Sequence, residues 1–173
     1  MFIDLLRKRR SIRQFEDKPV SPEQCDMLIE AALRSPSSRG INPWQFVVVK
    51  DKTMLAQVSQ AKTHGAAFLK NAPLAIVVCA DTSKTDVWIE DASIAAIIIH
   101  LAAADLGLGS CWAQMRLRSR DDGTPASDYI ANILDLPEHI QVEAVIGIGH
   151  PADKMDGHGA DTLLYDQVSY EKF

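Results

Sequence analysis

Runs of consecutive apolar residues mark the strands that this sequence predicts. Residues 45–50 (QFVVVK), 74–80 (LAIVVCA) and 142–148 (VEAVIGI) each form a short, nearly unbroken apolar stretch of the kind found in buried strands. A further strand is predicted to begin where residues 107–112 (GLGSCW) follow the longest helical segment. The chain therefore supplies four candidate strands.

Apolar residues at helical spacing predict helices between these strands. A short helix is expected from Ile3 toward the basic residues that follow it, and another after Ser21, which can cap it, with Pro22 suited to the first turn. Asp51 is the expected cap of a third helix, and residues 127–134 form another. Strands that alternate with helices indicate a mixed α/β or α+β layer fold without defining the strand order.

The longest predicted helix covers residues 86–106 and is apolar on nearly all sides between Ala92 and Ala104. Such a pattern means burial on several faces, and we expect a second subunit to supply part of that burial. Residues 152–173, by contrast, are mostly polar and have little periodicity. A tail of this length is unusual on a compact domain unless it packs on something.

Length and composition fit one globular domain that spans residues 1–173, without repeats or a linker. The formal net charge of -5 disfavours nucleic acid and anionic membranes as partners. The three cysteines form no CxxC pair, as expected of reduced thiols in a cytoplasmic protein. No apolar segment approaches the roughly 20 residues of a membrane span, and no signal peptide is predicted.

Basic residues crowd the N-terminal part of this otherwise acidic chain. Arg9, Arg10, Ser11 and Arg13, which we call the arginine segment (residues 9–13), alternate long cations with a hydroxyl. They can converge on one phosphate because each guanidinium binds oxygens in pairs. On composition alone, a solvated basic helix end explains the same residues equally well.

Three other segments could meet a ligand. Residues 35–44 (SPSSRGINPW), the polar loop, contain small residues that would let the backbone approach a planar ring, although an ordinary helix-to-strand connection uses the same residues. Residues 107–115 (GLGSCWAQM) are no dinucleotide fingerprint because Trp112 replaces its third glycine, and Gly107 fits a helix C-cap. Gly149 ends a predicted strand, and Lys154 is a cation that follows it, so this segment could bind an anion.

Other chemistries find little support in the sequence. No GxSxG elbow, P-loop or HExxH motif is present. The five histidines do not fall at metal-ligand spacings with the cysteines. The histidines and aspartates of the tail are better explained as a solvated segment than as a loose metal site, so we expect no metal.

Four motifs, taken together and in order, make the chain resemble the nitroreductase family of flavoproteins. They are RRSIRQF, SPSSRGINPWQFVVV, EDASIAAIIIHLAAADLGLGSCW, and GIGHP with a tail that ends VSYEKF. The resemblance covers nearly the whole chain, and four ordered motifs are far more specific than any one. It implies an α+β fold, with a mixed β-sheet flanked by helices, in an intertwined homodimer that binds FMN at the subunit interface.

The resemblance also implies roles for individual residues. The phosphate and ribityl chain of FMN would be held by Arg9, Arg10, Ser11 and Arg13, with Gly149 and Lys154 near a second phosphate contact. The polar loop would meet the flavin through Pro36, Ser37, Ser38 and Asn42. The backbone that approaches the reactive ring edge would be that of Trp112, Ala113, Gln114 and Met115. The tail, about residues 152–173, would pack on the partner subunit.

The chain departs from the family's pattern at two places. The family loop often reads Asn-x-Gln-Pro-Trp where Gly40 and Asn42 stand here, so one side-chain contact to the flavin is missing. No arginine follows Gly149, which leaves Lys154, or Lys172 near the end, as the C-terminal cation. The chain is also short for the family, and we expect it to lack the insertions that roof the substrate pocket.

The activity that the resemblance implies is a ping-pong hydride transfer from NADH or NADPH, through FMN, to a nitroaromatic, a quinone or a similar electron-poor acceptor. FMN would carry the hydride chemistry, so no side chain is expected to be a catalytic acid or base. Two alternatives stay open. One is a flavin-consuming or dehalogenating relative with the same fold, and the other is a flavin-binding dimer without catalytic activity.

Overall fold

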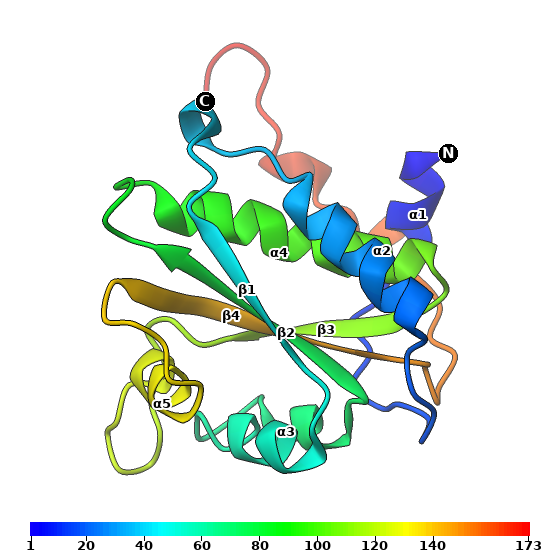
Figure 1. The fold of residues 1–173 in the computed structure, drawn as a ribbon. Helices are drawn as coiled ribbons and strands as arrows, with labels where there is room; N and C mark the ends of the chain where they lie inside the picture. Colours follow the sequence, from blue (N-terminus) through cyan, green and yellow to red (C-terminus); the bar gives the residue numbers. More distant parts are fainter.

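The computed structural model describes all residues 1–173 and contains five α-helices and a four-stranded sheet (Figure 1). The strands are β1 (Trp44–Val49), β2 (Leu74–Asp81), β3 (Gly109–Gln114) and β4 (Ile140–Gly149). Their order is β1-β2-β4-β3, and all neighbouring strands are antiparallel. An isolated bridge between Ser11 and Ser110 adds a parallel pairing. The predicted α+β class is confirmed.

Helices cover both faces of the sheet. They are α1 (Phe2–Lys8), α2 (Pro22–Leu33), α3 (Lys52–Val58), α4 (Trp88–Asp105) and α5 (Ala126–Ile133). Figure 1 shows α2 and α4 on one face of the sheet and α3 and α5 on the other. The sheet therefore separates two apolar cores, one built around Leu28, Ile99 and Ile146 and the other around Leu55 and Ile130.

Helices α2 and α3 begin, and α4 ends, at the capping residues that the sequence offers. The Ser21 hydroxyl accepts a hydrogen bond from the Gln24 amide, and the Gln24 side chain accepts one from the Ser21 amide. The Asp51 carboxylate accepts one from the Met54 amide at the start of α3. After α4, Gly107 adopts a φ of +72° and the Leu108 amide donates to the carbonyl of Ala103, which is the Schellman arrangement.

Strand β1 differs from the fully buried strand that its sequence predicts. It lies at the edge of the sheet, and Phe46, Val47 and Val48 are only partly buried. An apolar run has the same pattern whether or not its outer edge is covered, so the sequence could not show this. In one copy of the chain, the β1 edge stays open.

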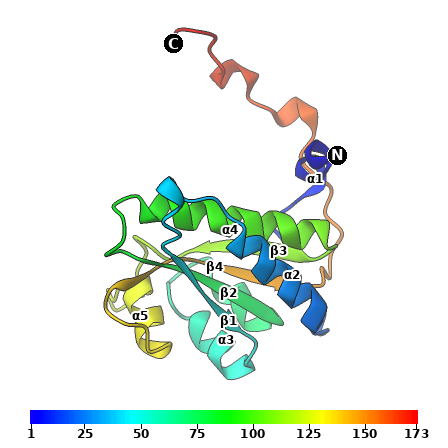
Figure 2. The same cartoon turned by 45° about the horizontal axis from the view of Figure 1, so that its top comes forward.

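The C-terminal tail leaves the body of the molecule (Figure 2). It contains only short 3-10 turns, at Ala160–Thr162 and Tyr165–Gln167, and every residue from 158 to 173 is exposed. The exposed side chains include several large apolar ones, namely Leu163, Leu164, Tyr165, Val168, Tyr170 and Phe173. None of the helices combines the length and the apolar character that crossing a membrane requires.

Candidate functional site

The arginine segment runs along the outer edge of β3. The Ile12 amide donates to the Ser110 carbonyl at 2.9 Å, and the Glu16 amide donates to the His150 carbonyl at 2.9 Å. A Cβ atom on Gly109 would lie 2.8 Å from the Ile12 side chain, so glycine permits this close approach. The arginine segment therefore lies against the start of β3, and the residues that follow it are bound to the chain that leaves β4.

Three guanidinium groups of this segment have no carboxylate partner within 4.0 Å: those of Arg9, Arg10 and Arg13. They line a cavity of about 330 Å³ together with Ser11 and residues of the tail that include Asp153 and His158. An adjoining cavity of about 400 Å³ places Lys154 beside Arg9 and Arg10. The fold thus brings the basic residues predicted at the two ends of the chain together, and their charge is available to an anion.

The tail also contacts the arginine segment directly. Arg10 Nη1 donates to the backbone carbonyl of Asp156 at 2.7 Å. Gly157 passes the carbonyl of Arg7 so closely that a side chain at this position would collide with it. The first residues of the tail therefore form one wall of the basic cavity, before the chain turns away.

Backbone groups of β3 alternate between β4 and the open edge. The Ser110 carbonyl faces outward to Ile12, whereas the Met115 amide faces β4 and donates to the Glu143 carbonyl at 3.1 Å. Because this direction alternates along an antiparallel strand, Trp112 and Gln114 direct their N–H groups outward, beside the arginine segment. Ala113 and Met115, also predicted as ligand contacts, face β4 with their backbone, and their side chains are buried in the core under α3 and α5.

The side chains of Trp112 and Gln114 are tied to a buried carboxylate. Trp112 Nε1 donates to Gln114 Oε1 at 2.9 Å, and Gln114 Nε2 donates to Glu143 Oε1 at 3.0 Å. Glu143 Oε2 is buried without a hydrogen-bond partner. Because Gln114 also donates to the Arg116 carbonyl, both N–H groups of its side-chain amide are used within the chain, and its backbone N–H is the donor that remains for a ligand.

The polar loop lies at the far end of α4 from the arginine segment. The Ser38 amide donates to Asp91 Oδ1 at 2.8 Å, near the start of α4, whereas Arg9 meets His100 nine residues further along. At 1.5 Å per residue these two helix positions are about 14 Å apart. Figure 1 shows the loop before β1 and helix α1 at opposite ends of α4. The predicted loop residues, Pro36, Ser37, Ser38 and Asn42, therefore do not join the arginine segment of the same chain.

Within the polar loop, Ser37 and Asn42 bind each other. Ser37 Oγ donates to Asn42 Oδ1 at 2.7 Å and accepts from the Asn42 amide at 2.8 Å. Arg39, Gly40 and Asn42 have φ values of 53°, 65° and 53°. Left-handed conformations at non-glycine residues persist only where surrounding contacts hold them, so this loop presents a constrained surface.

Lys62 is a cation of this region that the sequence did not single out. Burial lowers the pKa of Lys62, and the charge of Arg118 lowers it further. Burial raises the pKa of the Cys111 thiol on β3, and the charges of Arg13 and Lys62 partly oppose that rise. Both cations therefore lie within electrostatic range of the same strand. An isolated lysine between a helix and a strand forms no motif, so no sequence signal could have identified it.

Gly149 has a structural role. It pairs with Gly109 across β3 and β4. A Cβ atom on it would lie 2.6 Å from Pro73 Cδ and 2.9 Å from the ring of Phe15. Packing alone therefore accounts for glycine at this position.

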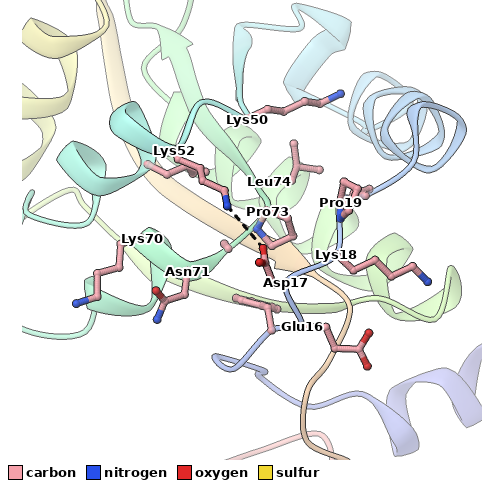
Figure 3. Close-up of a pocket in the computed structure, with 14 residues that line it drawn as sticks. Glu16, Asp17, Lys18, Pro19, Lys50, Lys52, Lys70, Asn71, Pro73 and Leu74 are labelled. Atoms are coloured by element: carbon pink, nitrogen blue, oxygen red, sulfur yellow. Dashed lines mark ion pairs between the residues drawn. The ribbon is translucent and has the colours of Figure 1, made fainter.

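The largest cavity, about 610 Å³, contains none of the predicted site residues (Figure 3). Four lysines line it: Lys18, Lys50, Lys52 and Lys70. Lys52 points toward Asp17 at 3.6 Å, and the other three extend away from the cavity. Both partners of this ion pair are almost fully exposed, which makes the pair weak. The groove has no converging set of donors comparable to the arginine segment.

Known proteins resemble this chain over its whole length. The family model described as the nitroreductase family matches residues 6–63 and 53–150. A protein from Archaeoglobus fulgidus, provisionally named NADH dehydrogenase/NAD(P)H nitroreductase, is 37% identical over 99% of this chain and 98% of its own. The structure of an FMN-dependent nitroreductase from Clostridium difficile R20291 is 48% identical with a TM-score of 0.97 over 99% of both chains. A structure from Parabacteroides distasonis, provisionally named like the archaeal protein, is 31% identical with a TM-score of 0.91 over 99% of this chain and 98% of that one.

Proposed function

The chain belongs to the nitroreductase family, and we propose that it binds FMN and works as an NAD(P)H oxidoreductase. The observation that carries this proposal is the unpaired charge of Arg9, Arg10 and Arg13 around one cavity. The phosphate of FMN is nearly dianionic, and charge-assisted hydrogen bonds from arginine match it in charge and in geometry. The residues present therefore fit the anionic end of FMN.

The open edge of β3 fits the ring of FMN. Trp112 and Gln114 direct backbone N–H groups to this edge, where they can donate to polar atoms of a planar ligand. Arg13 and Lys62 place positive charge near the same strand, and such charge stabilises negative charge that develops on a ring beside it. When bound, FMN supplies the redox chemistry by passing a hydride from NADH or NADPH to an electron-poor acceptor such as a nitroaromatic or a quinone.

We further propose that the nicotinamide and the acceptor use one pocket in turn, in a ping-pong cycle. The chain has no dinucleotide fingerprint that would bind the reductant separately, because Trp112 replaces the third glycine. The polar side chains next to the open edge, those of Gln114 and Glu143, are bound to one another. The protein's part is accordingly to bind and orient, without a side chain that acts as an acid or a base.

A second copy of the chain completes the site in this proposal. The polar loop and the arginine segment sit at opposite ends of α4, so two α4 helices packed antiparallel would bring the loop of one copy to the arginine segment of the other. Ile94 and Ile97 of α4 are partly exposed, as are Phe2 and Leu6 of α1. Apolar patches of this kind mark protein interfaces.

The tail packs on the partner subunit in the same proposal. Six large apolar side chains between residues 163 and 173 are more than half exposed. Complete burial of an exposed Leu or Phe side chain contributes about 1.5–3 kcal/mol before the costs of association and of ordering the tail are subtracted. The other copy offers a place for them, because an apolar groove of about 470 Å³ lies between α2 and the open strand β1.

The test is the visible spectrum of the purified protein, followed by an anaerobic titration with NADH and with NADPH. We expect a yellow homodimer whose flavin absorbance bleaches with at least one nicotinamide and returns when a nitroaromatic or a quinone is added. A protein that fails to take up FMN contradicts the proposal. Bound FMN that neither nicotinamide reduces would mark a non-catalytic flavin protein, and destruction of the FMN under oxygen would mark a flavin-consuming relative.

A further inference from the structure

His100 is a buried histidine of α4 to which the proposed chemistry assigns no role. It is 4% exposed. Its Nε2 atom lies 3.1 Å from Arg9 Nη1, and its Nδ1 atom lies 2.5 Å from Ser110 Oγ. Both ring nitrogens are therefore engaged, one by the arginine segment and the other by the start of β3.

These contacts determine where the imidazole carries its proton. A guanidinium only donates hydrogen bonds, so Nε2 must accept from Arg9 and carries no proton itself. The proton is then on Nδ1, which donates to Ser110 Oγ. The Ser110 hydroxyl can donate onward to the backbone carbonyl of His100, 3.4 Å away. The hydrogen bonds run in one direction, from Arg9 through His100 and Ser110 to the backbone of α4.

The ring stays neutral at physiological pH. Burial lowers the pKa of His100 to about 4, and the charge of Arg9 contributes to the shift. A carboxylate in the place of His100 would hold Arg9 equally well but would cancel its charge. A neutral acceptor holds the guanidinium and leaves its full charge to an incoming anion.

We propose that His100 is a positioning residue that holds the Arg9 guanidinium in place to bind the phosphate of FMN. This proposal rests on the proposed function. One of the five N–H donors of Arg9 binds His100, and the others remain for phosphate oxygens. Because the long side chain is ordered before the ligand arrives, less conformational entropy is lost on binding.

The test compares two flavins on two variants. Riboflavin has the ring of FMN without the phosphate, so it reports on the ring site alone. His100→Leu removes the acceptor, and His100→Gln retains an amide oxygen that can accept from Arg9. Dissociation constants for both flavins are measured on the apoprotein by flavin fluorescence. We expect His100→Leu to weaken FMN binding roughly tenfold and to leave riboflavin binding within about twofold, and we expect His100→Gln to restore most of the FMN affinity.

A double-mutant cycle with Arg9→Ala completes the test. In that background His100→Leu should cause no further loss of FMN affinity, because the side chain that His100 positions is gone. Equal weakening of both flavins, an unchanged FMN affinity, or additive losses in the double variant would overturn the proposal. If His100→Leu does not fold, Ser110→Ala, which removes the partner of Nδ1, should weaken FMN binding selectively, and an equal effect on both flavins would again overturn it. A wild-type protein that binds neither flavin would instead refute the proposed function.

Discussion

Arg13→Ala tests the phosphate site with little risk to the fold. The Arg13 side chain is exposed and forms no ion pair and no hydrogen bond within the chain. Substitutions at such positions change the free energy of unfolding by less than about 0.5 kcal/mol. Any loss of FMN affinity in this variant therefore reports on binding and not on folding.

The expected loss follows from the number and kind of bonds removed. A hydrogen bond to a charged group contributes about 1.5–3 kcal/mol. Arg9 and Arg10 line the same cavity and can replace part of the lost interaction with the phosphate, so the expected loss of binding free energy is about 1–3 kcal/mol. At 1.4 kcal/mol for each factor of ten, FMN binding should weaken by about 5- to 150-fold. Binding of oxidised riboflavin should change little, because riboflavin lacks the phosphate and its oxidised ring carries no charge.

The assay is fluorescence titration of the apoprotein at two ionic strengths. Loss of one phosphate-binding cation should also reduce the salt dependence of FMN affinity. Arg34→Ala is the control, because Arg34 is also an exposed arginine and its ion pair with Glu30, at the C-terminal end of α2, lies outside the cavity. If Arg13→Ala binds FMN as tightly as the wild type and the Arg34→Ala control do, the phosphate assignment is wrong.

Three further predictions concern the interface, the polar loop and the buried histidine. Deleting residues 159–173 should turn the dimer into monomers at concentrations where the full chain stays dimeric, as measured by light scattering; an unchanged dimer would refute the packing of the tail on the partner. Asp91→Ala should lower the free energy of unfolding by about 1–3 kcal/mol in urea titrations, because the Ser38 amide loses its acceptor, whereas Asp91→Asn, which keeps an acceptor oxygen, should lose less. His100 has a pKa of about 4 when folded and 6.5 in the reference state, so the unfolded chain binds the extra proton between these values. The free energy of unfolding should therefore fall by at most about 3 kcal/mol as the pH drops from 6.5 to 4, and above pH 6.5 it should not depend on this group. If the free energy of unfolding of a His100→Gln variant falls equally steeply with pH, the assignment is wrong.

The starts of α2 and α3 and the end of α4 were predictable from the sequence because capping is a local interaction. Ser21 and Gln24 are three residues apart, as are Asp51 and Met54, and the bonds between them form as soon as the chain turns. Gly107 likewise ends α4 where its positive φ is needed. The α+β class and the family could be identified for the same reason, since they depend on the order of such local segments along the chain.

The arrangement of the site depended on contacts between distant residues. The direction in which Trp112 and Gln114 point their N–H groups is set by which side of β3 faces β4, and no residue of β3 encodes that choice. The separation of the polar loop from the arginine segment follows from their contacts at opposite ends of α4, through Asp91 and His100.

The sequence by itself determined the secondary structure elements, the α+β class, the family, and the basic residues that could meet a phosphate. Only the tertiary structure decided that β1 and β3 are the edges of the sheet and that basic residues from both ends of the chain, Arg9, Arg10 and Lys154, line one cavity. It also decided that the polar loop does not reach the arginine segment of the same chain. The physical reason is the range of the interactions. Caps and periodicity act between residues a few positions apart, whereas edges, cavities and buried hydrogen bonds such as that between Arg9 and His100 join residues far apart in the chain, and they exist only once the sheet has assembled.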